Sequence, residues 1–406
     1  MGWSGLPLAF AFLPMEVPAP FWFVQFFKVV GFVLHMIPMG IWFAGLPVVI
    51  LCALWNGKHS RFYARRMSAQ LPVMMALGIN FAIVPLLFLQ TTYYKAFYTA
   101  TILTAWYWLA VIPILIVGYY SIYIAAYSGE RRGRRILFSI LASLCLIEIA
   151  LLITNGLTLM VSSEKWAAMI DQTSHYGAVW GTAHNFSDQT LWLRLAAMFG
   201  LGLLTAGVWA TFDAHFLKPK NAPENYRQWA TTLAVVMAFA GLMIITGLEC
   251  VTRMENDALH QQKMEIIAEG IDAMSKVEKI KELGFSSLGL AAGYPHFEFY
   301  ITPLIIFTFV TLLTARFYPG WWGSARVVGF AAALQFFALA GFGVIRQIGQ
   351  NDGMATFVDV STLPEKVQWS PLIAFVVCFL LGVGVIVWMV VQCVKCAGSP
   401  PTEPQV

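Results

Sequence analysis

The sequence has few charged residues. Asp, Glu, Lys and Arg make up only 11% of its 406 residues, whereas 59% are hydrophobic, and a soluble domain of this size normally has about a quarter charged residues. This deficit excludes an ordinary soluble globular protein. The net charge of +4 is therefore no sign of nucleic-acid binding, and we expect no nucleic acid among the partners.

Motifs for several cofactor classes are also missing. There is no Cys-x-x-Cys-His, so no covalent haem c is expected. Neither Gly-x-x-x-x-Gly-Lys nor a Gly-x-Gly-x-x-Gly after a strand occurs, which argues against nucleotide binding. The histidines match no zinc spacing, so no metal site is predicted.

Cysteine usage does not indicate a secreted disulfide framework. All six cysteines lie in or beside apolar stretches, which is not the pattern of a small disulfide-bonded domain. Cys393 and Cys396 have the spacing of a redox pair, but no second pair or histidine accompanies them. We interpret them as inert thiols at a helix end.

The first 20 residues lack the basic n-region of a signal peptide and contain four prolines. They do not read as a cleavable signal peptide. An extended segment that leads into the first span is expected instead.

What the sequence has in abundance is long apolar stretches. A helix needs about 20 apolar residues to cross a bilayer, and helices satisfy their own backbone in lipid. We therefore predict an all-α integral membrane protein of about nine transmembrane helices, with residues 1–406 as one membrane domain. The predicted spans are about 22–55, 71–93, 97–127, 136–161, 190–213, 228–250, 297–317, 324–348 and 371–393.

The basic residues predict the orientation. They gather in every second loop, namely at Lys58, Arg61, Arg65, Arg66, Arg131, Arg132, Arg134, Arg135, Lys218, Lys220, Arg227, Arg316 and Arg326. Loops rich in Lys and Arg stay in the cytoplasm. This places the N-terminus outside and the C-terminus inside a bacterial inner (cytoplasmic) membrane.

The outer loop 251–296 is the one strongly charged stretch. Its core, residues 255–282, has the period of an amphipathic helix, with Met264, Ile267, Ile271 and Met274 at spacings of three and four. One interpretation is a solvated helix lying on the membrane surface. The other is a lid over a ligand site in the outer leaflet.

Ionisable groups at membrane depth are functional candidates because they are costly there. His35 is followed by Met36 and Met39, which fits a haem-ligand neighbourhood or a hydrogen-bonded packing histidine. Glu148, in the fourth predicted span, must be protonated, paired or next to water.

Four further groups, Arg194, Glu249, Arg253 and Arg346, fall near the outer ends of their predicted helices. They form either one charged cluster or separate side chains that reach the interface independently.

Several short motifs, in matching order, resemble subunit I of cytochrome bd-type quinol oxidases. The second span has the family's G-I-N-F-A at residues 78–82, and Gln25-Phe26 with Pro38 matches its first span. Asn155-Gly156 resembles its A-N-G-W. Residues 340–342, with Gln350 further on, resemble its A-G-W and R-Q region.

The resemblance covers about residues 22–350 and also implies nine spans with a long outer loop after the sixth. In that loop, Gln262-Lys263 followed by Glu265 and Glu269 is similar to the family's quinol-binding loop. The resemblance therefore implies a quinone site at Lys263, Glu265 and Glu269.

The departures from the family are as informative. The family's haem ligands fall on Val33, near Leu195 and near Thr302, and its eighth-span glutamate falls on Leu339. Its two third-span glutamates have no acidic counterpart between residues 99 and 127. His35 lies two residues from the matched position, about 200° around the helix. The chain is therefore not expected to reduce oxygen itself.

The sequence leads to three interpretations of function. The first is a membrane subunit of a quinone-linked respiratory electron-transfer complex. It would anchor cytochrome-type redox partners and other membrane subunits, with quinone and a b-type haem at His35 as candidate cofactors. The second is a small-molecule transporter, which needs a polar path at mid-membrane. The third is a redox-inactive scaffold of a membrane complex.

Overall fold

A computed structural model describes residues 16–217, 221–268, 297–318, 324–355 and 360–398. Side chains are not described for most of 252–268, for 297–300 or for 396–398. The first half of the chain contains α2 (Phe21–Phe43), α3 (Gly45–Trp55), α4 (Lys58–Thr92), α5 (Tyr94–Leu103), α6 (Ala105–Ala126), α7 (Arg132–Met160), η1 (Ser163–Lys165), α8 (Trp166–Thr173), β1 (Ser174–His175) and β2 (Ala178–Val179).

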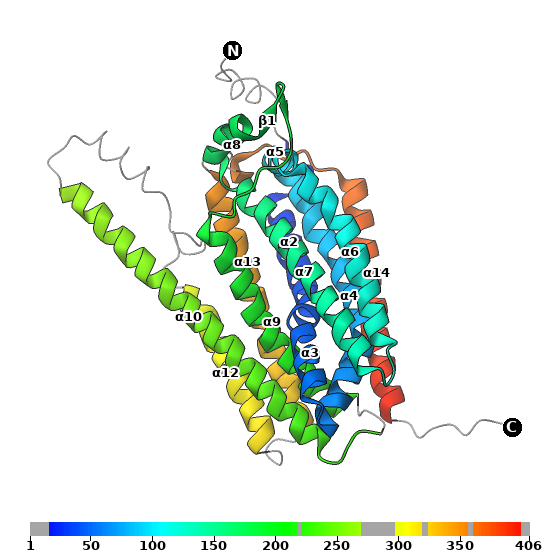
Figure 1. The fold of residues 1–406 in the computed structure, drawn as a ribbon. Coiled ribbons are helices and arrows are strands. Elements are labelled where there is room, and N and C mark those ends of the chain that lie inside the picture. Colours follow the sequence, from blue (N-terminus) through cyan, green and yellow to red (C-terminus); the bar gives the residue numbers. More distant parts are fainter. Residues whose placement is uncertain (1–15, 218–220, 269–296, 319–323, 356–359, 399–406) are drawn as a thin grey trace.

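The second half contains α9 (Gln189–Phe216), α10 (Tyr226–Ala268), α12 (Phe297–Phe317), α13 (Ser324–Ala355), η2 (Val360–Thr362) and α14 (Trp369–Gly398). In the described part of the chain, eight helical segments are long and apolar enough to cross a membrane, and α12 adds a shorter apolar stretch, Ile301–Phe317. The prediction of an all-α membrane protein is confirmed, and the long helices lie side by side in a bundle (Figure 1).

Two predicted spans are interrupted. The first breaks at Ala44, between α2 and α3, because Pro47 has no amide hydrogen for the carbonyl of Phe43 and its ring crowds that carbonyl. The third breaks at Thr104, between α5 and α6. There the backbone of residues 181–183 replaces helix bonds: Ala183 donates to Leu103 at 2.9 Å, and Trp106 donates to Gly181 at 3.1 Å.

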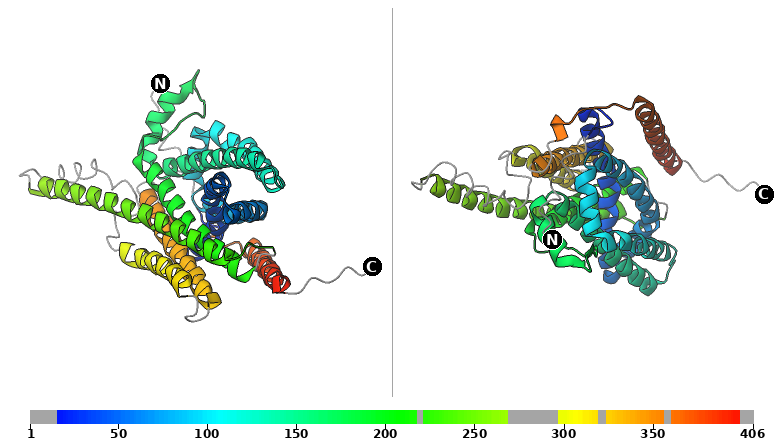
Figure 2. Two further views of the ribbon diagram at one scale, coloured as in Figure 1. Left: turned by 60° about the horizontal axis from the view of Figure 1, so that its bottom comes forward. Right: turned by 90° about the horizontal axis from the view of Figure 1, so that it is seen from above.

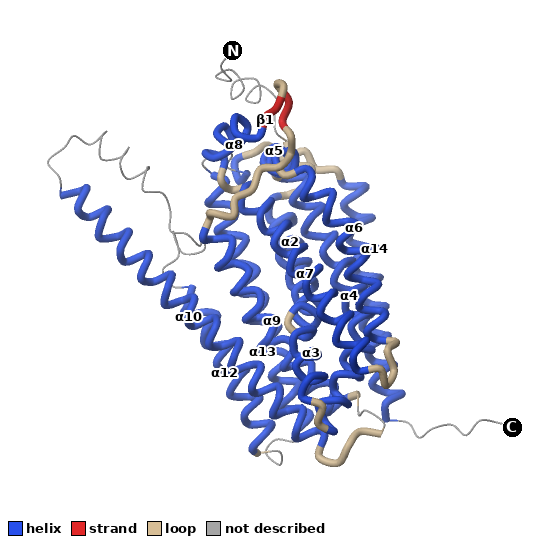
Figure 3. The backbone as a smooth tube through the Cα atoms, viewed as in Figure 1, coloured by secondary structure: helices blue, strands red, loops and turns tan. Residues whose placement is uncertain are grey.

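The short elements gather at one end of the bundle. The β1–β2 hairpin, α5 and α8 lie there, and the described part of α14 ends at the opposite end (Figures 1 and 3). Val17, just before α2, forms a parallel bridge with Glu365, just before α14. The starts of the first and last spans are therefore at the same end, as an odd number of crossings requires.

The sixth apolar span ends at Val251, as the sequence predicted, but its helix does not end there. Helix α10 continues without a break to Ala268, and its last turns extend away from the other helices (Figure 1). The predicted amphipathic segment 255–282 thus begins as part of this helix, and residues 269–282 lie outside the described part of the chain.

Helix α9 is at the centre of the packing. Its glycines allow the α10 backbone to approach closely: a Cβ atom on Gly241 would lie 2.5 Å from the carbonyl oxygen of Gly200, and one on Gly207 would lie 2.9 Å from that of Ala234. Both distances are shorter than van der Waals contact. Close packing through small residues is typical of membrane helices.

We call the end of the bundle where α14 finishes the arginine-rich end. Basic residues there form hydrogen bonds and ion pairs with other groups of the same chain. Arg66 donates to both carboxylate oxygens of Asp213, at 2.5 and 2.7 Å. Gln70 donates to the same carboxylate at 2.7 Å. Arg132 donates to the carbonyls of Ala53 and Leu54 at the end of α3, at 2.6 and 2.7 Å.

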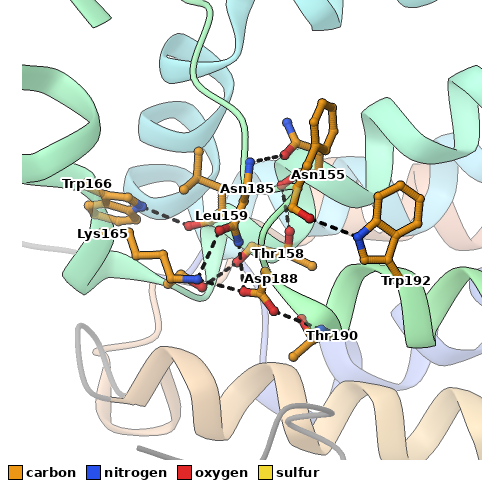
Figure 4. A network of polar contacts seen from close by, with 11 residues as sticks. Asn155, Thr158, Leu159, Lys165, Trp166, Asn185, Asp188, Thr190 and Trp192 are labelled. Carbon is orange, nitrogen blue, oxygen red and sulfur yellow. Dashed lines mark hydrogen bonds and ion pairs between the residues drawn. The ribbon is translucent and has the colours of Figure 1, made fainter. Parts of the chain in front are cut away.

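At the opposite end a polar network closes the junction between α7 and α9 (Figure 4). Asp188 caps α9 by accepting from the backbone N–H of Thr190 at 2.9 Å, and its other oxygen accepts from Lys165 at 2.9 Å. The Asn155 side chain, at the end of α7, accepts from the backbone N–H of Asn185 at 2.7 Å. Asn155, which the sequence singled out, is therefore a structural link between α7 and this loop.

Candidate functional site

The candidate site lies between α2 and α13, toward the end where α2 begins. Gln25, Lys28, Phe32 and His35 are spaced by three, four and three residues along α2, which puts them on one face of the helix. The residues of α13 that meet this face are Arg346, Gln347, Gln350 and Asn351.

The outer part of the site is a network of amides around one phenol. The hydroxyl of Tyr93, just after α4, accepts from the Gln25 and Gln347 side chains at 3.2 and 3.3 Å and donates to Asn351. Asn351 donates in turn to Gln25 at 3.3 Å. The network joins α2, the end of α4 and α13 with its polar groups satisfied, as buried polar groups require.

Lys28 is buried directly beside this network. Only 3% of its surface is exposed, its ammonium donates to Gln350 at 3.2 Å, and the ammonium lies 4.0 Å from the centre of the Tyr93 ring. A ring face and an amide oxygen both stabilise a cation. Among the described residues, however, no carboxylate forms an ion pair with Lys28.

Two arginines extend this positive charge. The Arg346 guanidinium lies 4.8 Å from the centre of the Phe32 ring. It is close enough to Lys28, His35 and Arg194 for their charges to interact. We call Lys28, Arg194 and Arg346 the cationic cluster.

The three residues of the cationic cluster lie inward from the ends of their helices. Arg194 is about 8 Å along α9 from its start, Lys28 about 10 Å along α2, and Arg346 about 14 Å from the end of α13. Within the described part of the chain, neither arginine has a carboxylate partner at ion-pair distance. Lys28 is buried and the two arginines are half-buried, and the charge of Asp188 acts on Arg194 from beyond ion-pair distance. Like charges gathered between helices are costly unless an anion neutralises them.

His35 lies about two turns further along α2 than Lys28. Its Nδ1 is 2.8 Å from the carbonyl oxygen of Gly78, in the G-I-N-F-A stretch of α4. If Nδ1 carries the proton, this hydrogen bond orients the ring and leaves Nε2 as the free acceptor. That is the usual second-shell arrangement of a metal-binding histidine. Nε2 of His35 could therefore bind a metal such as haem iron, and the cationic cluster could bind the carboxylates of an anionic cofactor.

The structure describes the side chains of only some of the other predicted site residues. Lys263 and Glu265 fall in the part of α10 whose side chains are not described, and Glu269 lies outside the described residues. Val33, which matches a haem ligand of the family, and Leu339, which matches its eighth-span glutamate, are 3% and 0% exposed and belong to the apolar core. Those two positions contribute packing and no ligands.

The four groups near the predicted outer helix ends are partly brought together. Arg194 and Arg346 lie close enough for their charges to interact. Glu249 instead accepts a hydrogen bond from Thr302 on α12, and the side chain of Arg253 is not described.

Sequence patterns did not predict four residues of the site, Lys28, Tyr93, Gln347 and Asn351. A signal for Lys28 was present, since it is the one Lys, Arg, Asp or Glu between residues 22 and 55, and such a residue in a span marks a functional site by default. Tyr93 and Asn351 are polar residues near helix ends, where they are common. Only the contact between α2 and α13 shows that they belong to one site.

No protein-family model matches the chain, and no curated protein matches its sequence. The chain is similar in structure to the bd oxidase from Geobacillus thermodenitrificans, with a TM-score of 0.61 and 11% sequence identity. The superposition covers 94% of this chain and 99% of the oxidase chain. At this identity the similarity shows the fold alone: the chain has the membrane fold of a bd oxidase.

Proposed function

We propose that the chain is a membrane subunit of a respiratory electron-transfer complex in a bacterial cytoplasmic membrane. We further propose that its site between α2 and α13 holds an anionic redox cofactor, a single b-type haem. The observation that carries this proposal is the cationic cluster beside His35, which has no carboxylate partner among the described residues. The bd-oxidase fold supports the respiratory setting.

The chemistry of the site suits this cofactor. A bound b-type haem supplies one-electron transfer, and its axial ligand is commonly a histidine. Nε2 of His35 is the nitrogen available for the iron, and the ring is held by Gly78. The cationic cluster supplies the charge that two propionates need in a medium of low dielectric constant.

The proposal is for one haem rather than the three of a bd-type oxidase. Val33, which matches a haem ligand of the family, is apolar and buried, and Leu195, near another matched ligand, cannot ligate iron either. Leu339, at the position of the family's eighth-span glutamate, is also apolar and buried. Without those ligands the chain would not reduce oxygen. It would pass electrons between partner redox proteins, which we expect to be cytochrome-type subunits and other membrane subunits.

The test is a haem extract and a reduced-minus-oxidised spectrum of the native assembly purified from membranes. One b-type haem per chain is expected, and it should be lost in His35→Ala. His59→Ala is the matched control, because His59 binds the Glu224 carbonyl at the arginine-rich end and should retain the haem. A chlorin-type haem d in this subunit, or a preparation without haem, would contradict the proposal.

Quinone binding at Lys263, Glu265 and Glu269 is proposed as a second site of the same subunit. Its basis is the sequence pattern, together with the continuation of α10 into this segment. Headgroup oxygens need donors and acceptors at the apolar boundary. Binding of a quinone analogue should weaken about tenfold in Lys263→Ala or Glu269→Ala. Unchanged affinity in both would assign the loop to partner docking.

A transporter is less well supported. The sequence offered Glu148 and His35 as polar groups for a path across the membrane. Glu148 is exposed on the outer surface of α7, whereas His35 contacts α4 inside the bundle. The two groups therefore do not line one path.

A further inference from the structure

One carboxylate lies on the lipid-facing surface of the bundle. Glu148 is exposed in the middle of α7. It continues a stripe with Leu137, Leu141 and Leu144, which are spaced by four, three and four residues and are all exposed. This spacing keeps the four side chains on one face of the helix.

The depth of Glu148 excludes contact with water at either end of α7. The residue is about 24 Å along the helix from Arg132 and about 18 Å from Met160, and a glutamate side chain is too short to reach the interface from there. Among the described residues no group donates a hydrogen bond to its carboxyl or forms an ion pair with it. A carboxyl in this position faces hydrocarbon unless another molecule covers it.

A second copy of the chain does not provide a suitable cover. The exposed lysines and arginines of the described spanning helices all lie near helix ends, as Arg61 on α4 and Arg326 on α13 illustrate. A symmetric dimer through this stripe would bring the two Glu148 carboxyls together without a cation at their depth. A cation that pairs with Glu148 at this depth would therefore come from a different chain.

We propose that the α7 stripe binds a membrane-spanning helix of a different subunit, which presents a Lys, Arg or His side chain to Glu148 at mid-membrane. Helix α7, which carries the stripe, lies at the edge of the bundle, away from α12 (Figure 2). Leucines at four, seven and eleven residues before Glu148 provide the apolar contact. The carboxyl selects the partner and fixes its depth, because a polar group without a partner is penalised in lipid.

The first test is site-specific photo-crosslinking in native membranes. A photoreactive phenylalanine analogue replaces Leu144 on the stripe, and Phe307 on α12, which is 58% exposed, serves as the control position. We expect an adduct from position 144 with the spanning segment of another membrane protein, close to a basic residue. Adducts with lipid alone, or with a second copy of this chain, would overturn the proposal.

The second test concerns charge. Glu148→Lys should lower the adduct yield at least tenfold, and changing the partner's basic residue to Glu should restore it. Leu137→Gln, a polar change on the same stripe, should leave the yield within twofold. No rescue by the charge swap would contradict the proposed pairing. The melting temperature of purified Glu148→Leu checks folding, and we expect it to equal or exceed that of the wild type.

This interface rests on the proposed role as a subunit of a complex, but different experimental results would contradict the interface and the cofactor proposal. A preparation without haem contradicts the cofactor proposal and leaves the cross-link unaffected. A cross-link to lipid alone removes the interface and leaves the haem spectrum unchanged.

Discussion

Positively charged side chains have different partners at the two ends of this bundle. At the arginine-rich end, cations are neutralised within the chain: Arg66 is held by both oxygens of Asp213, and Arg65 pairs with Glu130. Toward the opposite end, Lys28 contacts an amide oxygen and the Tyr93 ring, and Arg346 lies over the Phe32 ring. The charge of Arg194 acts on Arg346, and the charge of Asp188 acts on Arg194.

This difference separates structural charge from charge that serves a ligand. A buried ion pair satisfies itself and fixes how two helices meet, and its loss is costly because one charge is left alone. Cations that lie between helices without an ion-paired carboxylate are costly for folding and are therefore candidates for binding an anionic ligand. The cationic cluster is therefore the better guide to function, although the arginine-rich end holds more charge.

The comparison of the two ends depends first on how the chain is oriented in the membrane. The largest effect is expected in a labelling experiment that tests this orientation. In a variant without the six native cysteines, Tyr176→Cys on the β1–β2 hairpin should react fully with an impermeant maleimide in intact spheroplasts. Arg131→Cys, in the loop before α7, should react only after lysis. The reason is the gathering of arginine at one end. Labelling of Arg131→Cys alone in intact spheroplasts would invert the assignment.

The second effect concerns the ion pair between α4 and α9. The Asp213 and Arg66 side chains are 6% and 25% exposed, so Asp213→Ala leaves a half-buried guanidinium without its carboxylate partner. We expect a loss of about 3–5 kcal/mol in unfolding free energy, measured by denaturation in detergent micelles. Glu130→Ala is the control: the Glu130 side chain is 86% exposed, so less than about 1 kcal/mol is expected. Equal losses in the two variants would remove the distinction between buried and exposed pairs.

The third expected effect is an increase, not a decrease, in unfolding free energy. Lys28→Met removes a buried ammonium that has no described carboxylate partner and loses its hydrogen bond to Gln350. In chain purified without cofactor we expect a net stabilisation of about 1 kcal/mol, because the buried charge costs more than the hydrogen bond returns.

In the native assembly the same variant should retain about tenfold less haem. Lys58→Met, at the exposed start of α4, should change neither quantity. Destabilisation by Lys28→Met in cofactor-free chain would mean that Lys28 belongs with the structural cations.

The sequence predicted the architecture well and the site poorly, for related reasons. Bilayer crossing leaves a strong local signal, a run of about 20 apolar residues, so every predicted span corresponds to a helix. Interruptions such as Ala44 and Thr104 were missed. At Thr104 the break depends on bonds to residues 181–183, which no local pattern reveals.

The candidate site needs contacts between residues more than 250 positions apart, such as Tyr93 with Asn351. His35 was found because a histidine in a span is conspicuous. The family motifs directed attention to Gln25 and Gln350, which do belong to the site. The cationic cluster could not be derived from spacing alone, because its members come from three helices.

The smallest effect on stability is expected at Asp188, in the junction of α7 and α9 (Figure 4). The hydrogen-bond partners of this carboxylate all belong to the chain itself. Burial raises the pKa of Asp188, but hydrogen bonds from Lys165 and Thr190 outweigh it and hold the pKa below its usual range. Since the folded pKa lies below that of the unfolded chain, the ionised carboxylate stabilises the fold above about pH 4, and this contribution disappears as the pH falls through the folded pKa. Asp188→Ala should cost about 1 kcal/mol at pH 7, the usual value of a helix cap, and the difference from wild type should shrink as the pH falls below about 4. Melting temperatures in detergent between pH 3 and 7 measure both effects. A difference that stays constant over this range would show that the cap acts without its charge.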